Sequence, residues 1–311
     1  MPKRPRASRR AHVPLLQAPA LRRLAWLAHG FSTRRPGELN LNYSVGPSPA
    51  RVASNRRRVI HALGPPRGRR WQLLTLRQRH TDLIQVVRAP ESKNLRRLWR
   101  GAVARERDGA LKFIGDALIT DSSGVLLAVQ VADCLPILLV DPGRRVVAAI
   151  HAGWRGTAGR ITEKTIGRMR QAFGCDPRRL RAAIGPGIHA CCYEVGREVE
   201  EAFTSQFPYW EKLIRRVKPS PSQVHWQQRL FSSLPPPAER RPRPALTAPE
   251  AEKRFLDLVE ANHRQLRAAG ILRRHIWTSP LCTACRTDLF FSHRAKHGHT
   301  GRMMGLIGLR R

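Results

Sequence analysis

The stretch 131-VADCLPILLVDPGRRVVAAIHAGWRG-156 decides how this part of the chain folds. It holds two apolar runs, 136-PILLV-140 and 146-VVAAI-150, each with the length of a buried strand. Asp-Pro-Gly at 141–143 separates the two runs. These residue types favour a turn, because proline presets its own backbone angle and glycine tolerates left-handed conformations. The pattern therefore predicts an antiparallel hairpin.

The register of this hairpin predicts which side chains meet at its open end. If Val140 lies opposite Val146, then Leu135 faces His151 and Cys134 is one step away. A thiol and an imidazole then come together where strands give way to loops, the usual place for reactive groups on a rigid scaffold. For either residue alone, a buried cysteine beside an exposed histidine is the simpler alternative.

The residues around the thiol and the imidazole favour a functional site, because Asp133 and the glycine-rich 152-AGWRG-156 flank them. A thiolate and an imidazole form half of a catalytic zinc site, which uses three protein ligands and keeps a fourth position open. His80 is the best placed third ligand, since 78-QRHTD-82 lies between two strand-like runs. Other candidates along the chain are His61, His225 and His263.

The rest of the chain predicts a mixed α/β (α+β) fold in which helices flank one mixed β-sheet. Helices are expected over 48–64, 157–173, around 195–203 and over 251–269, where apolar residues recur with helical spacing and glycine follows three of the segments. Short runs rich in Val, Ile and Leu predict the strands, at 72–76, 83–87, 117–120, 125–131, 136–140, 146–150 and 181–185.

The domain organisation follows from shifts in composition along the 311 residues. Residues 1–12 are basic and predict a disordered arm. Residues 13–311 are expected to form a single catalytic domain. Within it, 214–250 is rich in Pro, Ser and Arg without sustained periodicity, which indicates a surface insertion.

Composition limits the class of protein. Basic residues outnumber acidic residues by 57 to 22, giving a formal net charge of +35 that attracts polyanions nonspecifically. The arginines are scattered and aromatic residues make up only 6%, so we do not expect specific nucleic-acid binding. No apolar stretch reaches the roughly 20 residues of a membrane helix, and no signal-peptide core follows the basic start. Six cysteines are too few and too irregular for a disulfide framework, which favours a cytoplasmic protein.

One arginine stands out on the helix predicted over 48–64. Arg56 falls between Val52 and Val59 on the apolar face of that helix, beside Asn55. An unpaired buried charge is very costly, so Arg56 must meet a carboxylate, a carbonyl or an anion. A buried ion pair and an anion site are equally compatible with the pattern.

Several motifs together resemble those of the laccase-domain proteins, known first as multicopper polyphenol oxidases and then as zinc-containing purine nucleoside phosphorylases. The resemblance covers residue 30 to the C-terminus, and its most specific pair is 132-ADCLPILLVD-141 with 151-HAGWRGT-157. The other matching segments are 30-GFSTR-34, 39-LNLN-42, 55-NR-56, 78-QRH-80, 185-GPGIHACCYEVG-196, 256-LDL-258, 282-CTAC-285, 290-FFSHR-294 and 300-TGR-302.

This resemblance implies a single α/β domain of the family's own type and a zinc ion held by His80, Cys134 and His151. It implies a purine nucleoside phosphorylase that cleaves adenosine, inosine, guanosine or methylthioadenosine with phosphate and that also deaminates adenosine. Arg56 and Arg155 are the candidates for binding phosphate. Asn40 is the candidate for contacting the sugar or the phosphate. The chain departs from the usual pattern at Arg79, in a shortened run before Asn40, and in the expanded 214–250 segment.

Three other functions compete with this hypothesis. A ligand set of two histidines and one cysteine also suits blue copper, but a multicopper oxidase needs several His-x-His pairs and only 297-HGH-299 has that spacing. A basic nucleic-acid-binding protein with a structural zinc is the second alternative. The third is a zinc amidohydrolase acting on a cell-wall precursor. The expected partners are a purine nucleoside and phosphate, with no membrane, in a monomer or homodimer.

Overall fold

The computed structural model describes residues 13–46, 48–64, 66, 70–88, 102–217 and 252–310. The chain divides into two compact units, each described here by itself. The first is built from the described residues of Met1–His189 and Leu258–Arg311, and the second from those of Ala190–Asp257. The predicted arm at 1–12 lies outside the described residues, as does the predicted insertion apart from its first four residues. The single catalytic domain over 13–311 remains a prediction.

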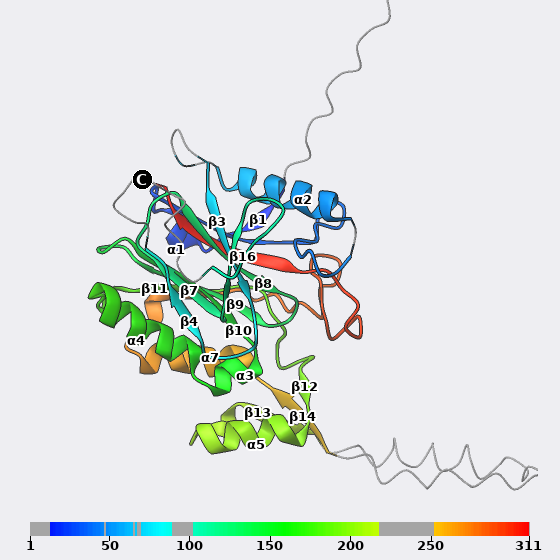
Figure 1. Cartoon of the computed structure of the whole chain (residues 1–311). Helices are drawn as coiled ribbons and strands as arrows, with labels where there is room; N and C mark the ends of the chain where they lie inside the picture. Colours follow the sequence, from blue (N-terminus) through cyan, green and yellow to red (C-terminus); the bar gives the residue numbers. More distant parts are fainter. Residues whose placement is uncertain are drawn as a thin grey trace, which may run out of the picture. The chain divides into compact units, whose positions relative to one another are not determined.

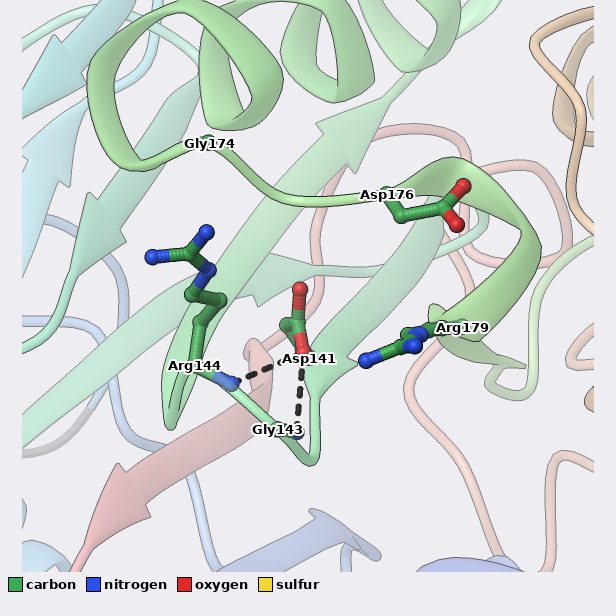
Figure 2. A pocket seen from close by; sticks show the side chains of 6 residues that line it. All are labelled: Asp141, Gly143, Arg144, Gly174, Asp176 and Arg179. Atoms are coloured by element: carbon green, nitrogen blue, oxygen red, sulfur yellow. Dashed lines mark hydrogen bonds between the residues drawn. The ribbon is translucent and has the colours of Figure 1, made fainter.

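The predicted hairpin is confirmed as β9 (Leu135–Asp141) and β10 (Val146–Ala152). The carboxylate of Asp141 shapes its turn, because Oδ1 accepts hydrogen bonds from the backbone N–H of Gly143 at 2.9 Å and of Arg144 at 3.0 Å (Figure 2). Arg145 completes the turn in a left-handed conformation with φ of 53°. The four residues at 142–145 therefore connect the paired positions Asp141 and Val146.

The predicted register is wrong by one residue, and the difference decides which side chains share a face. Val140 pairs with Val147, so Pro136 and not Leu135 lies opposite His151. Residues directly opposite each other point to the same face, and the side-chain period of a strand is two. The observed register thus puts Cys134, two residues before Pro136, on the face of His151. The predicted register puts them on opposite faces.

In the described part of the first unit the strands form two sheets, whereas the sequence predicts one. The six-stranded sheet has the order β15-β11-β9-β10-β7-β4, with its further strands at Ile276–Thr278 (β15), Arg181–Ile184 (β11), Ala117–Thr120 (β7) and Ile84–Val86 (β4). The seven-stranded sheet has the order β1-β2-β16-β8-β3-β6-β5, with strands at Leu15–Leu16 (β1), Leu27–Ser32 (β2), Met303–Leu309 (β16), Val125–Val131 (β8), Gln72–Arg77 (β3), Leu111–Ile114 (β6) and Ala104–Arg105 (β5).

The two sheets pack face to face, and helices cover their outer faces (Figure 1). The core between the sheets is made of apolar side chains from both, such as Leu127 and Leu138. A second core lies between the seven-stranded sheet and helix α2 (Pro49–Ala62), which contributes Val59. Helix α4 (Ile161–Phe173) packs on β10 and β7 at the other side. The mixed α/β class is confirmed. Both sheets mix parallel and antiparallel pairs.

Two predicted helices begin elsewhere. The segment 157–173 is two helices, α3 (Trp154–Ala158) and α4, because Arg160 adopts a left-handed φ of 59° between them. Gly174, also left-handed, ends α4 as predicted. The segment 251–269 is a helix only from α7 (Leu258–Ala268), because Lys253–Leu256 forms strand β14. A short helix α1 spans Pro19–Arg22.

The second unit contains helix α5 (Arg197–Gln206) and a three-stranded sheet of β12 (Glu194–Val195), β14 and β13 (Ile214–Val217) in its described residues. The first residues of the predicted insertion therefore belong to a strand. Glu200 of α5 is nearly buried and accepts hydrogen bonds from Arg216 at 2.8 Å and Arg254 at 2.6 Å, one from each neighbouring strand. Among the described helices, none has the length and apolar character to cross a membrane.

Candidate metal centre

Three residues predicted as ligands converge at the open end of the hairpin. One nitrogen each from His80 and His151 and the sulfur of Cys134 all lie within 4.8 Å of one another. The two imidazole rings are nearly perpendicular, with centroids 4.8 Å apart and an interplanar angle of 79°. His151 is buried, Cys134 is half-buried and His80 is exposed, so the cluster opens to solvent on the side of His80.

A buried carboxylate holds the two histidines in place. Oδ1 of Asp116 lies 2.8 Å from Nδ1 of His151 and accepts the backbone N–H of His80 at 3.1 Å. Oδ2 accepts the backbone N–H groups of Arg79 at 3.1 Å and Thr81 at 2.8 Å, and the hydroxyl of Thr81 at 2.9 Å. The carboxylate acts as acceptor for Nδ1–H of His151, which leaves Nε2 to bind a metal. Asp116 therefore sets the tautomer of one ligand and the backbone position of another.

The same hydrogen bonds determine the charges of the cluster in the absence of metal. Burial opposes ionisation of Asp116, but hydrogen bonds from His151 and Thr81 outweigh it and hold the pKa of its carboxyl at about 2. Burial also opposes a thiolate at Cys134, yet the charges and hydrogen bonds of His151 and His80 lower the pKa of that thiol. Burial opposes the imidazolium of His151, but Cys134 and Asp116 raise its pKa. A thiolate, the form that binds metals, is thus favoured at Cys134.

Glycine is required beside the cluster because the backbone after His151 passes close to the other ligands. A Cβ atom on Gly153 would lie 3.0 Å from Sγ of Cys134 and 3.1 Å from Cδ2 of His80. These contacts are tighter than most that real Cβ atoms make, so an alanine at 153 requires Cys134 or His80 to shift by a few tenths of an ångström. The glycine-rich run 152–156 therefore allows the segments that carry His80, Cys134 and His151 to pack closely together.

Helix α7 fixes the turn that follows His151. The backbone N–H of Thr157 donates to the carbonyl of Gly153 at 2.8 Å. Asn262 of α7 donates to the hydroxyl of Thr157 at 2.9 Å, and Gln265 donates to its carbonyl at 2.7 Å. Asn262 and Gln265, two buried polar residues of α7, thus anchor the segment that carries the predicted ligand His151.

The other predicted ligands and contacts lie elsewhere. His61 is on α2 and His263 on α7, and within the described residues neither joins Cys134 and His151, while His225 is outside those residues. Arg155 is exposed, with its guanidinium 4.2 Å from the ring centroid of Trp154.

Arg56 is buried in an ion pair, one of the two alternatives left open by the sequence. Its Nε donates to the carbonyl of Leu41 at 2.8 Å. Its Nη1 lies 2.7 Å from Glu106 and 3.1 Å from Asp108. The guanidinium also stacks on the ring of Tyr43 at 4.5 Å. These carboxylates already neutralise its charge.

Asn40 is buried and its side chain is fully engaged with nearby backbone. Its Nδ2 donates to the carbonyls of Asn42 and Val45. Its Oδ1 accepts the N–H of Asn42 at 3.1 Å and the N–H of Arg302 at 2.9 Å. Its position supports the loop around 40–46 and the start of β16.

Sequence reasoning missed Asp116, and it named Asp133 only as a neighbour of the thiol, without its contacts. Asp116 has a local signal, because a carboxylate stands directly before the apolar run 117–120. Asp133, with a positive φ of 94°, is 7% exposed. Its carboxylate accepts the hydroxyl of Thr283 and the N–H of Arg294, both at 2.6 Å. It ties the residue before Cys134 to two later loops, and no local pattern predicts those partners.

A pocket of about 490 Å³ lies at the other end of β9, at the hairpin turn (Figure 2). Its lining residues are Asp141, Gly143, Arg144, Gly174, Asp176 and Arg179. Seven strand residues separate this turn from Cys134, a span of roughly 20 Å, so the pocket is not part of the metal centre.

Comparison with known proteins identifies the family of this chain. Residues 27–234 and 233–310 match the family described as multi-copper polyphenol oxidoreductase laccase. The purine nucleoside phosphorylase YlmD of Geobacillus stearothermophilus is 35% identical over 283 residues, which are 91% of this chain and 88% of that protein. A protein named adenosine deaminase, from an unknown prokaryotic organism, is 32% identical over 266 residues, covering 85% of this chain and 84% of its own.

Solved structures give the same result. The crystal structure of YlmD from Geobacillus stearothermophilus superposes with a TM-score of 0.69 at 34% identity, and the match covers 94% of each chain. Both the sequence motifs and the fold are thus shared over nearly the whole length. The chain belongs to the family described as multi-copper polyphenol oxidoreductase laccase, as its motifs predict, and it is an enzyme.

Proposed function

We propose that this protein is a zinc-dependent purine nucleoside phosphorylase that also deaminates adenosine. The observation that carries the proposal is the convergence of His80, Cys134 and His151, with one ligand atom from each within 4.8 Å of the others. Relatives named purine nucleoside phosphorylase and adenosine deaminase support the same chemistry. Adenosine, inosine, guanosine and methylthioadenosine are the proposed substrates.

The donor set fits zinc. Two neutral imidazoles and one thiolate are ligands that zinc takes in catalytic sites, where three protein ligands leave one position open. Asp116 orients His151 through Nδ1, the carboxylate–histidine arrangement that accompanies zinc ligands. When bound, the ion supplies a Lewis acid beside the reacting atoms. The family description mentions copper, which the same donors also bind, and metal analysis distinguishes the two ions.

The two proposed reactions need different groups from the chain. In phosphorolysis, a phosphate oxygen forms a bond to C1′ of the ribose while the C1′–N9 bond breaks, and the electron pair leaves with the purine. The purine takes up the proton that the hydrogen phosphate gives up, so the products are the free base and ribose 1-phosphate. In deamination, water adds at C6 of adenine and ammonia leaves, giving inosine. Phosphorolysis therefore needs a cationic group for phosphate, and deamination does not.

The chain's own residues provide a fixed scaffold for both reactions. His151 is buried and held by Asp116, and the segment after it is anchored by α7. The exposed side of the cluster at His80 gives a nucleoside access to it. Arg56 remains a candidate phosphate contact only if the ion pair with Glu106 and Asp108 opens. We also propose a cytoplasmic enzyme, in line with its sparse cysteines.

The test is metal analysis of purified protein together with a product assay on adenosine with and without phosphate. We expect about one zinc per chain, adenine plus ribose 1-phosphate when phosphate is present, and inosine when it is absent. Cys134→Ser and His80→Ala should each lose zinc and both activities together. Several coppers per chain with phenol oxidation, or zinc-free activity, would contradict the proposal. A cysteine nucleophile predicts instead that Cys134→Ser is inactive but retains full zinc.

A further inference from the structure

Arg302, which the sequence analysis quotes in 300-TGR-302 without assigning it a role, stands beside the metal centre. Arg302 directly precedes β16, whose first residue, Met303, pairs with Val131. The same antiparallel register continued by one residue places Arg302 beside Ala132, two residues before Cys134. The seven-stranded sheet thus brings the C-terminal part of the chain to the loop that carries the thiol ligand.

The backbone of Arg302 is fixed on both sides. Its N–H donates to Oδ1 of Asn40 at 2.9 Å, and its carbonyl accepts the N–H of Leu41 at 3.0 Å. Asn40 is itself buried and held by its neighbours. The residue proposed from the family resemblance as a sugar or phosphate contact therefore acts as a positioning residue for Arg302.

The guanidinium of Arg302 has one edge in use and one edge available. Nη1 donates to the carbonyls of Thr300 at 2.9 Å and Gly301 at 3.1 Å. In the part of the chain that the structure describes, Nε and Nη2 make no hydrogen bond, and no carboxylate forms an ion pair with the group. Nε and Nη2 form the side of the guanidinium fork that binds two oxygens of one anion.

The environment of this guanidinium favours an anion. Arg302 is half-buried, and burial lowers its pKa, whereas the negative charges of Cys134 and Asp133 raise it. The strand register, which puts Arg302 beside Ala132, accounts for the effect of these two neighbouring charges. Arg56 differs, because two carboxylates neutralise it. Arg155 differs because it is exposed on the ring of Trp154. Because no carboxylate of the described residues forms an ion pair with it, this half-buried cation can still be stabilised by an anion bound directly to its open edge.

We propose that Arg302 binds the phosphate co-substrate through its Nε and Nη2 edge, next to the metal centre. The inference rests on the proposed phosphorylase function and names the residue that this function requires. Arg302 holds the hydrogen phosphate while one of its oxygens attacks C1′; the purine leaves with the C1′–N9 electron pair and takes up the proton that the phosphate gives up. The guanidinium stays protonated throughout and transfers no proton.

The experiment compares zinc-loaded wild type, Arg302→Met and Arg302→Lys. Methionine fills similar space without charge, and lysine keeps the charge without the fork. With inosine as the nucleoside, we expect Arg302→Met to raise the KM for phosphate about 10- to 100-fold, which is the loss typical of a charge-assisted bidentate contact. The KM for inosine and the zinc content should stay within about twofold of wild type. Arg302→Lys should fall between the two. Arg168→Met, which removes an exposed arginine of α4, is the matched control.

Two further readouts separate the possible failures. Phosphorolysis should fall far more than phosphate-free adenosine deamination, whereas a merely structural role of Arg302 lowers both together with the zinc content and the melting temperature. Calorimetric titration of inorganic phosphate into the zinc-loaded proteins should show binding to wild type that is lost in Arg302→Met. An unchanged phosphate KM, or equal phosphate binding by both proteins, overturns the inference but leaves the phosphorylase intact. Absence of phosphorolysis in wild type overturns the proposed function, and the calorimetry then still decides whether Arg302 is an anion site.

Discussion

Replacing Asp116 by asparagine tests whether this carboxylate builds the metal centre. The carboxylate of Asp116 accepts hydrogen bonds from five donors. Asparagine preserves the shape of the side chain but replaces one of the two accepting oxygens by an NH₂ group. If the new NH₂ takes the place of Oδ2, the backbone N–H groups of Arg79 and Thr81 lose their acceptor. If it takes the place of Oδ1, the N–H of His80 loses its acceptor and His151 shifts its proton to Nε2, the atom that binds the metal.

The expected magnitude follows from these contacts. Each buried donor left without an acceptor costs about 1–3 kcal/mol, so one or two such donors lower the free energy of unfolding by about 1–6 kcal/mol. Loss of a carboxylate that orients a metal ligand typically weakens metal binding about 10- to 100-fold. We therefore expect Asp116→Asn to have a zinc affinity lower by that factor and a reduced activity that excess zinc partly restores.

The assay is competition for zinc with a chelator of known affinity, combined with urea unfolding of the metal-free protein. Asp121→Asn is the control, because Asp121 is exposed directly after β7 and contacts only Ser122 among the interactions described for it. Its zinc affinity should equal that of wild type. A folded Asp116→Asn protein that binds zinc with wild-type affinity would refute the argument that this carboxylate sets the tautomer of His151.

Three other changes have expected outcomes. Gly153→Ala should lose zinc because the added methyl lies 3.0 Å from Sγ of Cys134. The control is Gly167→Ala in α4, where nothing lies within 4 Å; it should bind zinc normally and gain up to about 1 kcal/mol of stability. Equal zinc content in the two variants contradicts the packing argument. Arg56→Met leaves Asp108 without its cation and Glu106 paired with Lys112 alone, and it should cost about 3–5 kcal/mol in urea unfolding at pH 7; a cost below about 1 kcal/mol means that the pair contributes little. Burial lowers the pKa of His29 from 6.5 to about 4. Between pH 6.5 and pH 4 the unfolded chain therefore binds more protons than the folded chain. About 3 kcal/mol of the free energy of unfolding, present above pH 6.5, should be lost as the pH falls toward 4. His29→Gln, whose amide can still accept the N–H of Ala18, should flatten this slope in unfolding curves measured from pH 7 to pH 4, and an unchanged slope rules out His29 as its source.

Local patterns predicted many of the elements and failed where distant pairing takes over. The strands at 72–77, 117–120, 125–131 and 181–184 were predicted to within a residue, because each is a compact apolar run. The segment at Lys253–Leu256 was predicted as helix, because its apolar residues continue the spacing of α7. It is a strand because it pairs with β13 and β12, partners that no local pattern specifies. The division of the strands between two sheets is likewise a matter of long-range pairing.

The sequence by itself determined the hairpin at 135–152 and the presence of a thiol and an imidazole at its open end. Apolar runs around an Asp-Pro-Gly turn act locally, and the motifs at His80, Cys134 and His151 supply the ligand types. Only the tertiary structure decided the rest. The turn shifts the register by one residue, which puts Cys134 and His151 on one face. Asp116 then positions His80 beside them through a hydrogen bond between two loops distant in sequence, and β16 brings Arg302 alongside. The reason is physical: side-chain direction alternates with every residue, so a single step of pairing that the sequence does not encode locally decides which groups meet.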